Sequence, residues 1–302
     1  MLFNVALEGV VRRSNIEKAG SIFSKSTQVL AFADDIDIVG RNIRAVKDAY
    51  SKLEKEAKKI GLYVNVEKTK FLMVCPSQRS RTLAGSHLEI GEKKFEVVSE
   101  FPYLGALVDD KFCTSKEIKR RIIAAGRSFY GLQHLLRSKN VSRSTKFAMY
   151  KTLIRPVAIY GSESWNTTEE DERQLGVFER KVLRTIIGPL KVSEDQYRRR
   201  YNHELYRIYQ ENDIAAVVKW RRLSWAGHVA RREEDRPVQM ALKGEFRDGK
   251  RTRGRPKNSW KEAVNSDCAK FGLNDWQKAA KDRTKYKQFL DSVMARSRAE
   301  YQ

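Results

Sequence analysis

The spacing of apolar residues changes near residue 112, and this change limits the chain to a mixed fold. Before it, short runs rich in β-branched and aromatic residues alternate with turn residues, which is typical of β-strands. After it, apolar residues recur every three or four positions, which is typical of amphipathic helices. We therefore expect an α+β fold whose strands lie mainly in the first third and whose helices dominate the rest.

The charge of the chain changes at nearly the same place. Residues 1–110 carry 17 Lys and Arg against 15 Asp and Glu, whereas residues 111–302 carry 43 against 23, and the whole chain has a net charge of +22. Such a surplus favours polyanionic partners, either nucleic acid or an anionic membrane surface. The plain alternative is a soluble surface that happens to be basic.

Cysteine usage and hydropathy exclude several classes of protein. Cys75, Cys113 and Cys268 lie far apart, which argues against a disulfide scaffold or a thiolate-rich metal site, and the four histidines show no metal-binding spacing with them. No apolar run approaches the ~18 residues of a membrane span. The opening residues contain Glu8 and lack a basic leader. We expect a nuclear or cytoplasmic protein that is not secreted and does not enter a membrane.

Local patterns predict the elements of the first 110 residues. Residues 2–13 have helical spacing, and residues 29–32 and 36–39 read as a hairpin with Asp34 and Asp35 at its tip. An amphipathic helix over residues 46–60 ends at Gly61. The remaining expected elements are strands at residues 62–66 and 70–74, and a hairpin joining residues 95–98 to residues 103–108.

The rest of the chain is predicted to be helical. Thr114 and Glu117 have the spacing of a capping box before the first helix. A second helix covers residues 143–160, with Pro156 bending or ending it, and Thr168 caps a third. The final hundred residues are basic and mostly helical, interrupted by a Gly/Arg-rich segment at residues 247–257.

Asp34 and Asp35 are the most suggestive pair of carboxylates in the chain. Aspartate is a common turn residue, so a solvated hairpin tip is the default interpretation. Here, however, the pair stands between an apolar strand and the sequence Ile-Asp-Ile-Val, which places both carboxylates on a rigid scaffold. There they could hold Mg²⁺ through hard oxygen ligands.

Several blocks resemble those of non-LTR retrotransposon reverse transcriptases, in the same order. Residues 30–36, Leu-Ala-Phe-Ala-Asp-Asp-Ile, resemble the Tyr/Phe-x-Asp-Asp box, with Phe32 keeping the ring but lacking the commoner tyrosine hydroxyl. The next blocks are Asn65 with Lys68 and Thr69, which resemble an Asn-x-x-Lys-Thr turn, and Tyr103-Leu104-Gly105, which resembles the primer-grip hairpin. Later blocks are Pro156, Tyr160-Gly161, Glu163 and Trp165, then Trp225-Ala226-Gly227-His228, then Gly254-Arg255-Pro256 with Trp260.

The resemblance is to the C-terminal part of such an enzyme, and it implies both a domain order and a reaction. Residues 1–110 would be a partial palm of antiparallel hairpins plus a helix, residues 111–190 a helical thumb, and residues 191–302 a basic helical region. The reaction would be two-metal nucleotidyl transfer, with Asp34 and Asp35 catalytic and holding Mg²⁺ or Mn²⁺. The partners would be an RNA template, a DNA primer and dNTPs.

The same resemblance implies that this polypeptide is inactive alone. The family takes a further catalytic carboxylate from an upstream strand, whereas Asp34 is the first aspartate of this chain. We also expect apolar faces around Leu30, Phe32 and Ile38 to lack cover, because the neighbouring palm strands are not in the sequence.

Basic side chains of the later region are candidate phosphate contacts, which are salt-sensitive and independent of base sequence. The candidates are Lys116, Lys119, Arg120 and Arg127 on the first helix, Lys146 and Lys151 on the second, and Lys250, Arg251, Arg253, Arg255 and Lys257 in the densest basic run. A solvated helix face is the alternative for the helices. The dense run could instead be a localisation signal or insert into a minor groove.

Two other functions remain open on the sequence alone. The chain could be a non-catalytic nucleic-acid-binding protein derived from a retrotransposon. It could also be an unrelated metal-dependent phosphotransferase that uses Asp34 and Asp35, but then the downstream blocks would be a coincidence.

Overall fold

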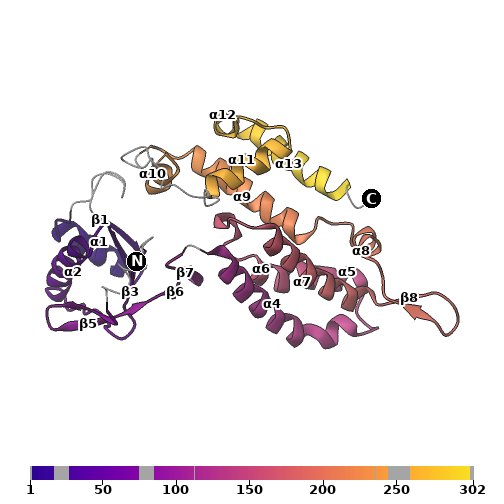
Figure 1. The fold of residues 1–302 in the computed structure, drawn as a ribbon, viewed down its shortest axis with the longest axis horizontal. Coiled ribbons are helices and arrows are strands. Elements are labelled where there is room, and N and C mark those ends of the chain that lie inside the picture. Colours follow the sequence, from indigo (N-terminus) through magenta and orange to yellow (C-terminus); the bar gives the residue numbers. More distant parts are fainter. Residues whose placement is uncertain are drawn as a thin grey trace. The chain divides into compact units, whose positions relative to one another are not determined.

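The computed structural model describes residues 2–16, 27–74, 85–111, 113–234, 236–243 and 259–299, which fall into two compact units. The first unit comprises Met1–Phe101, Asp109–Lys111 and Arg232–Arg255, and the second comprises Pro102–Val108, Phe112–Arg231 and Pro256–Gln302. Small sheets and helices occur together in the first unit, while helices dominate the second (Figure 1). The expected α+β class is confirmed. The expected division into three domains stays a prediction.

In the first unit, two helices cover one face of a hairpin. Helices α1 (Leu2–Arg13) and α2 (Ile43–Lys58) pack together, and α2 also packs on the hairpin of β1 (Thr27–Phe32) and β2 (Asp35–Gly40). Val29, Ile36 and Ile38 of the hairpin contact the buried cluster of these helices. The helix, the hairpin and the second helix were all predicted, because each rests on a local repeat of apolar residues.

A second sheet also packs against α2. Its strands are β3 (Lys70–Leu72), β4 (His87–Ile90) and β5 (Lys93–Val98), in the order β3-β5-β4. Strand β5 is antiparallel to β4 and parallel to β3. Its Phe95 lies edge-on to Tyr50 of α2, with ring centroids 5.0 Å apart. This sheet and the hairpin share α2 as their common support.

Two strand predictions were wrong in this region. Residues 95–98 pair with β3 and β4 instead of residues 103–108, because Gly91 adopts a positive φ of 60° in the tight β4–β5 turn and brings a nearer partner alongside. Residues 62–66 form no strand. Their alternating burial arises because Leu62, Val64 and Val66 pack against the clusters around α2 without a hydrogen-bonded ladder.

The chain then forms a short hairpin that leads into the helices. Strands β6 (Glu100–Tyr103) and β7 (Ala106–Asp109) form a two-stranded sheet. Between them Leu104 and Gly105 both have positive φ, of 45° and 79°. Two successive residues with positive φ define a type I′ turn, which matches the twist of antiparallel strands.

In the second unit, a group of helices encloses a large apolar core. These elements are α4 (Thr114–Arg137), α5 (Arg143–Met149), a π-helical turn (Tyr150–Ile154), α6 (Arg155–Ala158) and α7 (Glu169–Ile187), which lie side by side in Figure 1. Ile118, Phe129, Leu175 and Val182 are buried between them. Helix α8 (Asn202–Tyr209) adds Leu205 to the same core.

Some helix ends in this unit lie where the sequence predicts them, and others do not. Thr168 forms the predicted N-cap of α7, with a capping box to Asp171. Pro156 lies in the first turn of α6 and has no N–H to donate. The helix predicted across this region is therefore interrupted by the π-helical turn before Pro156 and continues as α6. The predicted capping box of Thr114 and Glu117 was wrong, because Cys113 is the N-cap of α4 and makes no side-chain capping bond.

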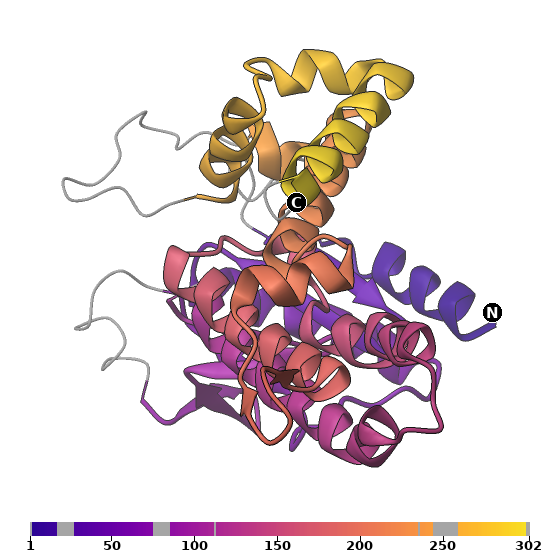
Figure 2. The ribbon, with the colours of Figure 1, turned by 90° about the vertical axis from the view of Figure 1, so that its right-hand side faces the viewer.

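The last helices pack around one long helix. Figure 2 shows α11 (Trp260–Lys270), α12 (Trp276–Lys281) and α13 (Arg283–Ala299) around α9 (Ile214–Ala230). The buried Arg222 of α9 donates hydrogen bonds to Asp267 of α11 and to the Trp165 carbonyl oxygen, both at 2.9 Å. The shorter elements are β8 (Leu190–Lys191), β9 (Tyr197–Arg198) and α10 (Pro237–Lys243), the last in the first unit. No helix among the described residues has the length and hydropathy of a membrane span.

Candidate functional site

Asp34 and Asp35 lie at the tip of the β1–β2 hairpin. Phe32 stands opposite Asp35 in the register, so Ala33 and Asp34 form a two-residue turn. Ala33 has a φ of 53°, a left-handed conformation that costs a residue with a Cβ about 1–2 kcal/mol. Both aspartates are exposed. The turn therefore presents two adjacent carboxylates to solvent from a rigid support.

The two carboxylates fit the donor chemistry of Mg²⁺. That ion binds hard oxygen atoms, usually one or two carboxylates completed by water and substrate phosphates. Within the described ranges, no group of three His, Cys, Asp or Glu side chains is close enough to form a complete protein site. Asp34 and Asp35 would therefore share an ion with oxygen atoms supplied by water, substrate or another residue.

One face of this hairpin is open and the other is covered. Leu30 and Phe32 are 37% and 66% exposed, as expected. Ile38 packs against the clusters of α2, so the expectation that it lacks cover was wrong. Asp35 and Asp37 stand opposite Phe32 and Leu30 and so share the open face. Asp37, unlike Asp35, is half-buried there, and this burial raises the pKa of Asp37 above its ordinary value.

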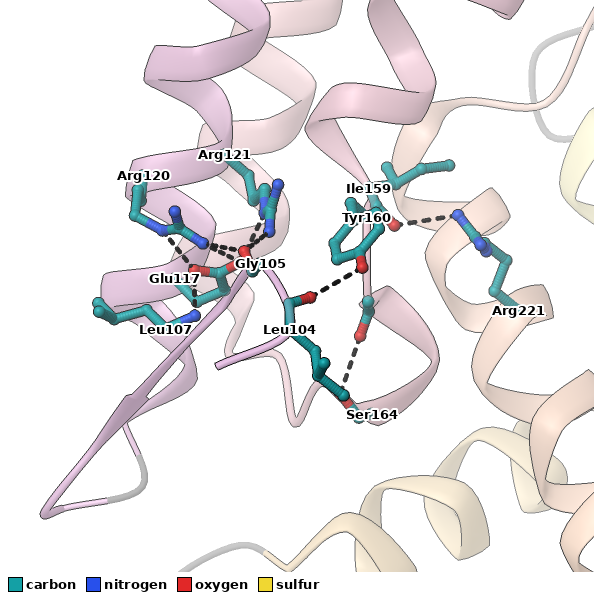
Figure 3. Close-up of polar contacts among 11 residues, drawn as sticks. Leu104, Gly105, Leu107, Glu117, Arg120, Arg121, Ile159, Tyr160, Ser164 and Arg221 are labelled. Carbon is teal, nitrogen blue, oxygen red and sulfur yellow. Dashed lines mark hydrogen bonds and ion pairs between the residues drawn. The ribbon is translucent and has the colours of Figure 1, made fainter. Parts of the chain in front are cut away.

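The β6–β7 turn is held by side chains of the second unit, and we call Glu117, Arg120, Arg121 and Tyr160 the turn clamp (Figure 3). The Tyr160 hydroxyl donates to the Leu104 carbonyl oxygen at 2.9 Å. Arg120 and Arg121 both donate to the Gly105 carbonyl oxygen. These bonds tie both residues of the turn to α4 and to the segment that follows α6.

Glu117 organises the turn clamp from a buried position. Its carboxylate accepts hydrogen bonds from Arg120 at 2.8 Å, from Arg121 at 2.5 Å and from the Leu107 backbone N–H at 3.0 Å. Burial alone would raise the pKa of Glu117, but these hydrogen bonds outweigh it and hold the pKa below its ordinary value. Glu117 is therefore ionised at neutral pH and fixes both guanidinium groups.

Arg121 also contacts the ring of Tyr160. Its guanidinium carbon lies 4.4 Å from the ring centroid, which is cation–π geometry. The same tyrosine ring lies 3.6 Å from the position where a Cβ on Gly105 would stand. The turn thus packs against the ring as well as bonding to the hydroxyl.

The other predicted site residues have local or partial roles in the structure. The Asn65 side chain accepts a hydrogen bond from the Lys68 backbone at 3.1 Å, and the Thr69 hydroxyl donates to the Asn65 carbonyl oxygen at 2.7 Å. These three residues therefore form one closed turn. Tyr103 is half-buried in β6, next to the clamped residues Leu104 and Gly105. The role of Tyr103 in gripping a primer stays a prediction.

The residues predicted to contact phosphates differ in exposure and in their partners. Lys116, Lys119 and Arg127 lie exposed on α4, whereas Arg120 is half-buried and engaged in the turn clamp. Lys146 is buried, so its expected place on a polar face was wrong, and Lys151 pairs with Glu211 at 2.7 Å. The run of Lys250, Arg251, Arg253, Arg255 and Lys257 lies outside the described residues.

Arg121 and a pocket on α9 were not predicted from the sequence. Arg121 lies four residues after Glu117, a helical ion-pair spacing that could have indicated it. The pocket is lined by Glu163, Trp220, Arg221, Ser224, Trp225 and His228. Its α9 members recur at helical spacing, but nothing local to α9 indicates that Glu163 faces them.

Comparison with known proteins agrees with the blocks in the sequence. Residues 1–108 match the family model of reverse transcriptase (RNA-dependent DNA polymerase), a range that includes both aspartates and most of the β6–β7 hairpin. The chain is also similar to a transposon-derived protein of Caenorhabditis elegans, with 26% identity over 262 residues, or 85% of this chain and 92% of that protein. The second similarity therefore extends into the helical region.

Proposed function

Because this chain is a retrotransposon reverse transcriptase-like protein, we propose that its first unit carries the metal-binding tip of a palm and its second unit the thumb of a non-LTR element's enzyme. The observation that carries the proposal is the hairpin tip that exposes Asp34 and Asp35 inside the segment matching the family. The substrates would be an RNA template, a DNA primer and dNTPs.

Asp34 and Asp35 would hold the ion that nucleotidyl transfer requires. When bound, a divalent metal activates the attacking hydroxyl and stabilises charge on the phosphoryl oxygens. The two carboxylates bring negative charge to the hairpin tip and would hold the ion in place there. Their exposure leaves room for substrate phosphates to approach.

The second unit would bind the template–primer through its backbone. Residues 111–302 carry 43 basic against 23 acidic residues, and a surplus of this kind contacts phosphates without reading bases. Near the junction of the units in the sequence, the turn clamp holds the Leu104–Gly105 backbone in one conformation. A rigid turn suits the placement of a primer strand, because positioning contributes directly to the rate of transfer.

This polypeptide by itself would bind nucleic acid without polymerising. That reading rests on the two carboxylates at the hairpin: among the residues that the structure describes, no third His, Cys, Asp or Glu side chain joins them to complete the ligand set of a two-metal site. It makes the chain, taken alone, a nucleic-acid-binding protein.

Binding and primer extension can be measured on the same primed RNA template, with Mg²⁺ or Mn²⁺ present. We expect binding that weakens steeply as salt increases, and no incorporation of dNTPs. Asp34→Asn should leave binding unchanged. Extension that is lost in Asp34→Asn would show that the chain is a polymerase in its own right. Binding that does not respond to salt would contradict the role of the basic unit.

A further inference from the structure

Helix α9 presents two different surfaces from one short stretch of sequence. Ala226 and Gly227 are buried, and a Cβ on Gly227 would come within 2.3 Å of the Tyr286 ring of α13. Trp225 is 37% exposed, and His228 stacks on it with ring centroids 5.0 Å apart and planes at 19°. Packing against α13 thus accounts for Gly227, but not for the exposed Trp225 and the half-buried His228.

The Trp225 and His228 rings belong to a pocket of about 290 Å³, shared by α9 and the short 3₁₀ helix Ser162–Ser164. Glu163 lies opposite the aromatic residues of α9, and its carbonyl oxygen accepts a hydrogen bond from the Trp260 indole at 2.8 Å. This volume is at the small end of the ~300–1,000 Å³ typical of ligand pockets. It suits a single flat ring system better than a whole nucleoside triphosphate.

The polar groups of the pocket leave hydrogen-bonding capacity unused. Arg221 donates to the Ile159 carbonyl oxygen at 3.0 Å (Figure 3), and its other terminal nitrogen lies 3.5 Å from Oε2 of Glu163. That Oε2 atom is buried and accepts no hydrogen bond from any residue that the structure describes. Because Oε2 faces Arg221 and is closed to solvent, a ligand in the pocket would meet the exposed part of the Glu163 side chain, which is 35% exposed, and its carboxylate can accept N–H groups there.

We propose that this pocket binds one unpaired nucleobase of a single-stranded nucleic acid, with a preference for guanine. Trp225 and His228 stack on each other, so a base would add to the outer side of this pair, and stacking on such rings is the general way in which proteins hold unpaired bases. Guanine presents two adjacent N–H donors, N1 and N2, which match the free acceptor capacity of the Glu163 carboxylate. A phenol or a peptide side chain does not offer this pair of donors beside a flat ring.

Several basic side chains near the pocket already have acidic partners. Lys219 pairs with Glu172, Arg221 with Glu163 and the buried Arg222 with Asp267, so ring stacking and hydrogen bonding, and not local charge, favour a nucleobase here. The inference rests on the proposed binding of nucleic acid, but it assigns a separate site that reads a base instead of a duplex backbone.

Fluorescence anisotropy with labelled oligouridine strands, with and without one guanine, tests the site. We expect Trp225→Ala to weaken single-strand binding about tenfold, and Trp225→Phe to retain most of the affinity. Glu163→Gln should remove the preference for the guanine-containing strand. Tyr63→Ala is the matched control, because Tyr63 is an aromatic residue in the first unit with 76% exposure. A fully paired RNA–DNA duplex should bind all variants equally.

The outcomes separate this inference from the proposed function. If the wild-type chain binds neither strand nor duplex, the proposed function fails. If it binds both, and Trp225→Ala with an unchanged circular dichroism spectrum binds the single strand like wild type, the pocket inference is overturned. Guanosine monophosphate that binds as tightly as the strand would also overturn it, because the ligand would then be a free nucleotide.

Discussion

The hydroxyl of Tyr160 donates a hydrogen bond to the backbone carbonyl oxygen of Leu104 at 2.9 Å, although the two residues are 56 positions apart. Arg120 and Arg121 bind the carbonyl oxygen of the next residue, Gly105. One turn of two residues is therefore held by α4 and by the segment that follows α6. A turn bound on both carbonyls has little freedom, and this rigidity can be measured.

Tyr160→Phe should loosen the β6–β7 turn. The substitution removes the hydroxyl but keeps the ring under Arg121, so we expect a loss of about 1 kcal/mol and faster amide hydrogen exchange at residues 104–107. Tyr130→Phe is the control, because the Tyr130 hydroxyl accepts from Lys181 at another place on α4. If amide hydrogen exchange at residues 104–107 is unchanged in Tyr160→Phe, the other hydrogen bonds of the turn clamp are enough to hold the turn, and the prediction is wrong.

Acid should release the turn clamp. The pKa of Glu117 is held below its ordinary value of 4.5, so its ionised form contributes stability above that pH, and the contribution is lost as pH falls through the folded pKa. Glu117→Gln should cost about 1.5–3 kcal/mol at neutral pH and remove this part of the acid sensitivity. Urea unfolding of both proteins from neutral pH down to about pH 3 measures the difference. Equal acid sensitivity of the variant and the wild type would contradict it.

Glu179 should give the opposite pH dependence. It is fully buried and accepts hydrogen bonds from Tyr150, Tyr206 and the Ile214 backbone at 2.8, 3.0 and 2.9 Å. Burial raises the pKa of Glu179 to about 7 from an ordinary 4.5, despite these donors. The folded state therefore holds a proton that the unfolded state has lost, and stability should fall by up to ~3 kcal/mol as pH rises through this interval.

The same residue offers a direct control. Glu179→Gln cannot ionise, so its free energy of unfolding should vary less between pH ~5 and pH ~8 than that of the wild type. Chemical denaturation at both pH values provides the comparison. The assignment would be contradicted if the free energy of unfolding of the wild type rose over this interval and that of Glu179→Gln showed the same dependence on pH.

Gly227→Ala should weaken the packing of α9 on α13. Alanine favours helix formation by about 1 kcal/mol over glycine. The added Cβ would, however, meet the buried Tyr286 ring, whose hydroxyl is fixed by a hydrogen bond to the Leu223 carbonyl oxygen at 2.8 Å. Overpacking of this kind costs about 1–3 kcal/mol, so we expect a net loss in thermal unfolding. Gly126→Ala on α4 is the control, because nothing lies within 4 Å of its Cβ position.

The sequence predicts what is local in this fold. Thr168 and Asp171 are three residues apart, so the N-terminus of α7 could be read from the sequence before any packing is known. Thr114 and Glu117 have similar spacing, but α4 begins at Thr114 itself and the Glu117 carboxylate binds the Leu107 amide instead. A distant donor displaced the local one, and spacing alone does not distinguish the two cases.

The candidate site also contains residues that the sequence predicts and residues that only tertiary folding brings together. Asp34 and Asp35 are adjacent in the chain, and apolar and polar residues alternate in the strand that follows them, so their exposed position was predictable. Arg120 was expected to face phosphates, whereas tertiary folding brings the Gly105 carbonyl oxygen to it. The α9 pocket joins Glu163 to residues about 60 positions later, and such a pairing cannot be read from helical spacing.

Paramagnetic broadening by Mn²⁺ in NMR spectra of the chain bound to a primed template tests the central claim most directly, namely that Asp34 and Asp35 bind the catalytic metal. We expect broadening centred on the amides of these two residues, and its loss in the Asp34→Asn, Asp35→Asn double variant with template binding unchanged. Broadening centred elsewhere, or broadening at the hairpin that persists in the double variant, would contradict the claim.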